Sequence, residues 1–98
     1  MFDFVSVEPA FENCTLVEQI FEAIDLAGLI VRKMKISSSK TFTIDFFGTS
    51  IYLACSTQDS YETISVNIIL DNEKLDDMFI SSYEDSDILC ERLTHYTN

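Results

Sequence analysis

A dense run of carboxylates near the end of the sequence is the first place to look for chemistry. Positions 71 to 91, called here the acidic stretch, hold eight acidic side chains: Asp71, Glu73, Asp76, Asp77, Glu84, Asp85, Asp87 and Glu91. Clustered carboxylates can bind hard cations, act as acid and base in catalysis, or present a recognition surface to a cationic partner. Their spacing and setting must decide among these uses.

The spacing does not fit a calcium-binding loop of the EF-hand type. Such a loop beginning at Asp71 would need oxygen ligands at its third and fifth positions, glycine at the sixth and glutamate at the twelfth. The sequence has Glu73, Leu75, Asp76 and Ser82 at those positions, so only the third position matches. We therefore predict no metal site and no cofactor.

The residues needed for catalysis are also missing from any recognisable arrangement. Paired carboxylates act as acid and base when one of them lies in a dry cleft with a raised pKa, and the outer face of a terminal helix provides no such cleft. The single histidine, His95, follows Cys90 by five residues, which places the two side chains on different sides of a helix. Two glycines, Gly28 and Gly48, cannot build a phosphate-binding loop. We predict that the chain is not an enzyme.

The composition predicts one folded domain over 1–98. The chain is 47% hydrophobic and carries a formal net charge of −11 with a pI near 4.1. Such acidity disfavours direct binding to nucleic acid or to an anionic membrane. There is no membrane-length apolar run and no basic leader, and Cys14, Cys55 and Cys90 form an odd, widely spaced set of thiols. We expect a cytoplasmic protein with free cysteines.

The charge is concentrated at the two ends of the sequence. Residues 1–31 carry −6, residues 32–70 carry +1 and residues 71–98 carry −6. Four of the six bases, Arg32, Lys33, Lys35 and Lys40, lie in the middle third. They either discourage sheet-to-sheet aggregation at an edge strand, the interpretation we favour, or contact an acidic partner or the protein's own acidic helices.

Hydrophobic periodicity places the elements that must position these charges. A helix is predicted from Asn13 or Thr15 to Gly28, with Glu18, Glu22 and Asp25 on its solvated side. Period-two alternation then predicts four strands joined as a meander over 30–36, 41–46, 51–55 and 62–70, and a weak alternation over 2–7 suggests a short extra strand. The alternation predicts one core face, with Ile30, Met34 and Ile36 pointing inward from the first of these strands. It also predicts three apolar residues on the opposite face of the sheet: Phe47, Tyr52 and Ile69.

The last third of the sequence is interpreted as helical. Leu75, Met78 and Phe79 suggest one apolar stripe and residues 88–93 another, with a break at Ser81-Ser82. A single kinked helix over 72–95 is the alternative. The predicted fold is a two-layer α+β domain of order α-β-β-β-β-α-α, in which the helices cover the apolar face of the sheet.

These features predict a non-enzymatic inhibitor whose acidic stretch binds a basic, nucleic-acid-binding surface of a partner protein or nuclease. In size, acidity and element order the chain resembles small phage-encoded inhibitors of host defence nucleases, including anti-CRISPR and DNA-mimic proteins. Two alternatives remain open: an immunity protein against a basic nuclease toxin, and a dimerising structural module whose acidity serves only solubility. A homodimer is compatible with each of them.

Overall fold

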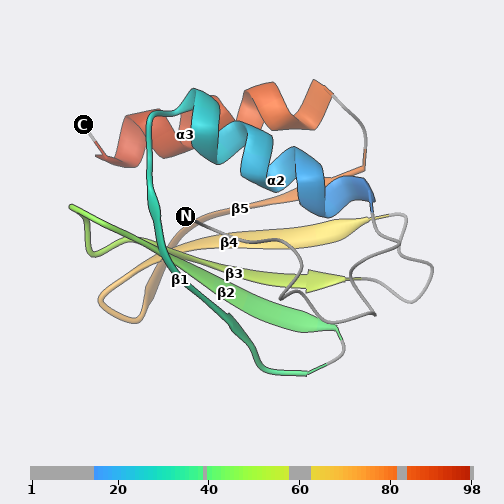
Figure 1. Ribbon diagram of the computed structural model, residues 1–98, viewed down its shortest axis with the longest axis horizontal. Helices are drawn as coiled ribbons and strands as arrows, with labels where there is room; N and C mark the ends of the chain where they lie inside the picture. Colours follow the sequence, from blue (N-terminus) through green and yellow to red (C-terminus); the bar gives the residue numbers. More distant parts are fainter. Residues whose placement is uncertain (1–14, 39, 58–62, 82–83, 98) are drawn as a thin grey trace.

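The residues that the structure describes form two helices on one face of a five-stranded sheet (Figure 1). The computed structural model describes residues 15–38, 40–57, 63–81 and 84–97. In chain order the elements are α2 (Thr15–Leu26), β1 (Val31–Ile36), β2 (Thr41–Phe46), β3 (Tyr52–Thr57), β4 (Ile64–Leu70), β5 (Glu73–Ile80) and α3 (Glu84–Thr97). The strand predicted over 2–7, together with Cys14 and Ser82, lies outside the described residues.

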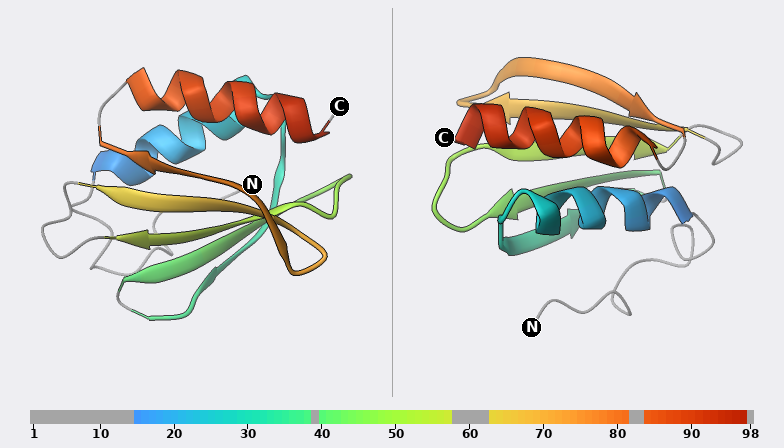
Figure 2. Two further views of the ribbon diagram at one scale, coloured as in Figure 1. Left: turned by 180° about the vertical axis from the view of Figure 1, so that it is seen from behind. Right: turned by 90° about the horizontal axis from the view of Figure 1, so that it is seen from above.

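The strands form one antiparallel meander in the spatial order β1-β2-β3-β4-β5. Both helices lie on the same face of this sheet, side by side and running in the same direction (Figure 2). The predicted two-layer α+β architecture is therefore confirmed, with five strands in the sheet instead of four. None of the described helices is long and apolar enough to cross a membrane.

The core lies between the sheet and the helix pair, and it follows from the period-two pattern. In β2, β3 and β4 every second side chain is buried, beginning with Phe42, Leu53 and Ile64 respectively. The helices contribute apolar side chains that recur at helical spacing, including Ile20, Ile24, Leu89 and Leu93. The predicted inward face of these three central strands is thus the observed one.

The prediction of a helix over 72–80 is wrong, because residues Glu73–Ile80 form the edge strand β5. Asp71 and Asn72 have positive φ angles of 53° and 66°, and two consecutive residues of this kind make the tight turn that reverses a hairpin. The chain therefore continues antiparallel to β4, with Met78 and Ile80 on the core side. The possible long helix over 72–95 is excluded by the same observation, and only one C-terminal helix is present among the described residues.

A second correction concerns the start of β1. The pairing register shifts between Val31 and Lys33, so that Arg32 occupies a β-bulge. A bulge inserts one residue and reverses the faces on its two sides. Met34 and Ile36 lie toward the core as predicted, whereas Ile30 lies on the other face and is 66% exposed.

The end of α2 agrees with its sequence signals. Gly28 has a φ of 76° and lies two residues after the last residue of the helix, in the left-handed conformation that a helix-terminating glycine adopts. The amide of Leu29 donates to the carbonyl of Ile24 at 3.1 Å. This closes the last turn and leads the chain into β1.

Candidate functional site: a carboxylate surface on the helix pair

One side of α2 is lined with carboxylates. Glu18, Glu22 and Asp25 are exposed and spaced at i, i+4 and i+7, which places them on one face of the helix. The opposite face carries the buried residues Val17, Ile20 and Ile24. The three carboxylates therefore point away from the sheet.

An equivalent stripe runs along α3. Glu84, Asp87 and Glu91 are exposed and spaced at i, i+3 and i+7, opposite the buried residues Leu89 and Leu93. Each stripe is about 10 Å long at 1.5 Å per residue. The sequence alternates acidic and apolar positions here so that burying the apolar side of α3 necessarily turns the acids to solvent.

The fold joins the two stripes into one surface. Helices α2 and α3 contact each other on the same side of the sheet (Figure 2), and packed helix axes lie about 8 to 10 Å apart. We call the resulting surface the acidic helical face, and it consists of Glu18, Glu22, Asp25, Glu84, Asp87 and Glu91. The two helices contribute one base, Arg92, and its guanidinium is directed toward β5.

Arg92 belongs to a network between α3 and β5. Its guanidinium donates to the Asp76 carboxylate at 2.8 Å and to the carbonyl of Asp77 at 3.0 Å. The phenol of Tyr96 donates to the same Asp76 carboxylate at 3.2 Å and to the carbonyl of Leu75 at 3.3 Å. Partial burial and the adjacent Asp76 carboxylate raise the pKa of Tyr96, so this phenol keeps its proton as the donor. The network fastens the helix to the edge strand.

Two further carboxylates of the acidic stretch also have bonds within the fold. The Lys74 ammonium lies 2.7 Å from the Asp77 carboxylate, and its hydrogen bond and charge hold the pKa of Asp77 below the ordinary value. The Asp85 carboxylate accepts from the amide of Ser81 at 2.8 Å and so reaches back over the start of α3. Asp76, Asp77 and Asp85 are therefore partly occupied with holding β5 and α3 in place.

The eight predicted site residues do not form one row. Asp71 and Glu73 are exposed at the β4–β5 turn, Asp76 and Asp77 lie on opposite faces of β5, and the remaining four start from α3. Three of the eight, Glu84, Asp87 and Glu91, lie on the acidic helical face. Sequence reasoning noted the solvated acids of α2 but did not place them beside those of α3. The equal charge of −6 on the two outer thirds was the available signal.

The described residues hold no recognisable metal or nucleophile site. No group of three or more His, Cys, Asp or Glu side chains among them could hold a metal ion. Burial raises the pKa of the Cys55 thiol, which keeps it protonated and unreactive. Cys90 is partly buried, and His95 is exposed about 140° further round α3 at 100° per residue.

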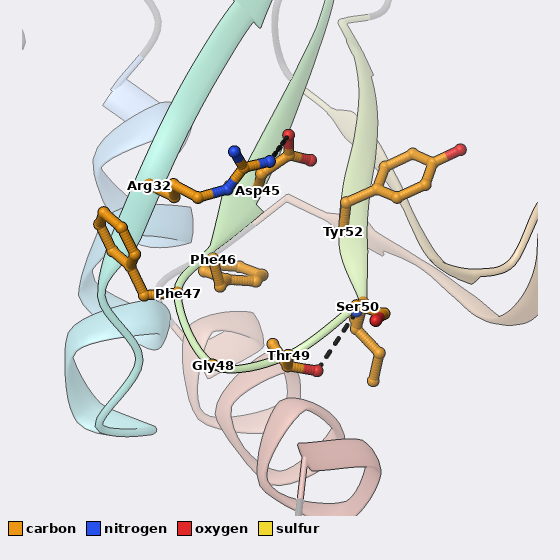
Figure 3. A pocket seen from close by; sticks show the side chains of 9 residues that line it. Arg32, Asp45, Phe46, Phe47, Gly48, Thr49, Ser50 and Tyr52 are labelled. Carbon is orange, nitrogen blue, oxygen red and sulfur yellow. Dashed lines mark hydrogen bonds and ion pairs between the residues drawn. The ribbon is translucent and has the colours of Figure 1, made fainter.

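A hollow of about 570 Å³ lies around the β2–β3 connection (Figure 3). It is lined by residues 46–52 together with Arg32 and Asp45. The two charged groups form an ion pair at 3.0 Å, so each neutralises the other. The carboxylates of the acidic helical face have no comparable neutralising partners in the described part of the chain, and that face is the stronger candidate for recognition.

Comparison with known proteins gives no relative to guide the assignment: no protein-family model, no curated protein and no solved structure matches the chain.

Proposed function

We propose that this chain is a non-enzymatic inhibitor that presents the acidic helical face to a basic, nucleic-acid-binding surface of a partner protein. The observation that supports it is the convergence of six exposed carboxylates from two separate helices on one surface. No lysine occurs on either helix, and the single arginine points aside to β5. A cationic partner would meet a field of one sign.

The surface carries an internal cost that a cationic partner would remove. Glu18 with Glu22, Glu22 with Asp25, Glu84 with Asp87, and Asp87 with Glu91 are like-charge neighbours three or four residues apart. Each such pair destabilises a helix by about 0.2 to 0.5 kcal/mol. Binding to lysines and arginines replaces repulsion by attraction, and it also accelerates association of the two proteins.

The charge density of the face is close to that of nucleic acid. Each stripe places three carboxylates along about 10 Å, and one DNA strand carries about three phosphates over the same length at 3.4 Å each. The axes of two packed helices lie about 8 to 10 Å apart, a separation between the widths of the minor groove, about 6 Å, and the major groove, about 12 Å. Proteins whose basic surface binds the two phosphate rows of DNA are therefore a suitable class of partner.

The test is displacement of DNA from basic proteins. A fluorescent 20-base-pair duplex is bound to each member of a panel of basic nucleases and non-specific DNA-binding proteins, and its release is followed by anisotropy as the chain is added. We expect release from at least one panel member, and we expect it to weaken as salt is raised because the attraction is electrostatic. If the chain displaces the duplex from none of them, the proposal is wrong.

A matched pair of double variants locates the surface. Glu22→Gln with Asp87→Asn removes two charges from the acidic helical face, and Asp71→Asn with Glu73→Gln removes two exposed charges from the β4–β5 turn. With each of the two lost contacts worth about 1 kcal/mol in water, the first variant should need about thirtyfold more protein for the same displacement. The second should change it little. The reverse order would assign binding to the turn.

The dimerising module has weaker support. Of the exposed large apolar side chains on the sheet, Ile30 and Phe47 adjoin each other at the beginning of β1, whereas Phe79 lies on β5, the opposite edge strand. One pair of residues and a distant phenylalanine are much smaller than the continuous apolar patch that a stable dimer buries. An immunity protein would use the same acidic face, and the panel member that responds distinguishes the two partner classes.

A further inference from the structure

The two edge strands of the sheet differ in how their outer backbone groups are bonded. In an antiparallel ladder, successive residues direct their N–H and C=O groups alternately to the two sides of the strand. The amide of Ser37 donates to the carbonyl of Thr41 at 3.0 Å, so the backbone groups of Lys35 and Lys33 also face β2. The backbone groups of Met34 and Ile36 must then point outward from β1.

On β5 several of the outward groups are bonded by side chains, although none of the bonds among the described residues closes those of Phe79, which lies between Asp77 and Ser81 in the alternation. The amide of Asp77 donates to the Asp76 carboxylate at 2.8 Å, and the carbonyl of Asp77 accepts from Arg92 at 3.0 Å. Next to them the carbonyl of Leu75 accepts from Tyr96, and the amide of Ser81 donates to Asp85. A further strand cannot add to this edge without breaking those bonds.

On β1 no such closure exists among the described residues. The strand pairs with β2 on one side, and neither a described strand nor a described side chain bonds the outward groups of Met34 and Ile36. Within the ranges that the structure describes, these two amides and two carbonyls have no partner, and they can pair with an added strand. An edge of this kind is a template for an extended segment.

The side chains of β1 define what such a segment should contain. Lys33 and Lys35 lie on the sheet face away from the helices, opposite Asp45 and Thr43 of β2, and both are exposed. Met34 and Ile36 lie on the core side and are half-buried. In the added segment, a carboxylate placed directly opposite Lys33 or Lys35 would stabilise the pairing of the two strands. An apolar side chain placed opposite Met34 or Ile36 would do the same. The complementary segment alternates acidic and apolar residues.

An apolar surface follows at the beginning of β1. The amide of Phe47 donates to the carbonyl of Ile30 at 2.9 Å, and the side chains of Phe47 and Ile30 are 58% and 66% exposed. Figure 3 shows the Phe47 ring beside β1, next to Arg32. A large apolar residue at the corresponding end of the added segment would cover both side chains and anchor it.

The same charges disfavour a second copy of this chain as the occupant. If two β1 strands paired antiparallel about Met34, Lys33 of each copy would lie opposite Lys35 of the other. Pairing about Lys33 or Lys35 would place that lysine opposite itself. Like charges directly opposite destabilise a sheet.

From these observations we propose that β1 is a docking edge for an extended segment of an acidic partner, in which carboxylates opposite Lys33 and Lys35 alternate with apolar residues. This surface lies away from the acidic helical face and is independent of it. The net charge of −11 repels such a segment at long range, but at 0.15 M salt the screening length is about 8 Å. The adjacent lysines then outweigh the distant carboxylates.

The probe is the capped peptide Val-Glu-Val-Glu-Val-Phe, titrated into the full chain at 0.15 M salt while backbone amide signals are recorded by NMR. We expect the amides of Met34 and Ile36 to shift and to become protected from hydrogen exchange. The capped peptide Val-Lys-Val-Lys-Val-Phe should bind about tenfold more weakly, because two attractive cross-strand pairs become repulsive.

A double variant and a control on the other edge complete the test. Lys33→Glu with Lys35→Glu changes two exposed side chains and should reverse the preference between the peptides, whereas Lys74→Glu on β5 should leave it unchanged. The proposal fails if neither peptide binds at millimolar concentration, if both bind equally, or if the shifts fall on β5. It also fails if Met34 and Ile36 become protected in the free protein as its concentration rises, because the occupant is then a second copy.

Discussion

Strands β1 and β5 are the two edges of one sheet, and both carry charged side chains. They differ in how their outward backbone groups are hydrogen-bonded. On β5 the charged side chains bond to the protein itself: Asp76, with Arg92 and Tyr96 from α3, bonds the outward backbone groups at Leu75 and Asp77. On β1 the lysines stand beside outward groups that have no partner among the described residues. Charged side chains on an edge strand can therefore either bond the outward backbone groups, as on β5, or leave them open to a partner, as on β1. The hydrogen bonds of the backbone distinguish the two cases.

The largest expected difference between the edges is in their anchoring to the core. Ile80 of β5 is fully buried, whereas Ile36 of β1 is half-buried, and both lie at the ends of their strands on the core side. Ile80→Ala should lower the free energy of unfolding by about 3 to 4 kcal/mol, and Ile36→Ala by about 1 to 2 kcal/mol. Urea denaturation of the two variants measures this directly. Equal losses would show that β1 is held as tightly as β5.

A second pair of variants compares the arginines of the two edges. Arg92→Leu leaves the partly buried Asp76, 25% exposed, without its guanidinium, and we expect a loss of about 1 to 2 kcal/mol. Arg32→Leu breaks the Arg32–Asp45 pair, which is more exposed at 52% and 33%, and should cost at most about 0.5 kcal/mol.

The same arginine pair also tests the closure of the β5 edge. Arg92→Leu frees the carbonyl of Asp77, so the variant should associate with itself at high concentration in sedimentation experiments, and Arg32→Leu should not. If Arg92→Leu remains monomeric and as stable as the parent, the α3 side chains do not close the edge.

The smallest expected effect concerns the acid side of the pH profile. Lys74 lowers the pKa of Asp77 in the folded state, so the pair contributes to stability above the unfolded-state pKa of about 3.9. That contribution is lost as the pH falls through the lower folded-state value. In Lys74→Gln the pKa of Asp77, followed by carboxyl NMR, should rise toward its ordinary value, and Lys33→Gln should leave it unchanged. An unshifted Asp77 in the first variant would remove Lys74 as the cause.

The sequence predicted those elements whose hydrophobic period is strong. Apolar residues alternate with polar ones at Phe42 and Ile44 and at Ile64 and Val66, a pattern that predicts only a strand. These four side chains are buried as expected. β5 was missed because its residues other than Ile80 are mostly charged or flexible types that disfavour strands, and Leu75, Met78 and Phe79 mimic a helical stripe. The pair Asp71-Asn72, which takes the left-handed conformation, was the available turn signal.

The candidate site was predictable in kind but not in arrangement. The carboxylates of α3 follow from the helix pattern after 84, and those of α2 were recognised as solvated. That the two sets form one surface depends on the packing of α2 against α3, which no local pattern encodes. The bonds that engage Asp76, Asp77 and Asp85 likewise depend on β5 being a strand, so they could not be separated from the exposed acids beforehand.

The pairing of α2 with α3 also bears on how the chain folds. Every strand pairs with its neighbour in the sequence, so the sheet assembles from local hairpins with little loss of chain entropy, which favours rapid formation. The contact between α2 and α3 instead joins residues 15–26 to residues 84–97 and closes a long loop. We expect the helix pair to be the late step, in which the two like-charged helices must approach against their own repulsion. Added salt should therefore speed folding by screening that repulsion.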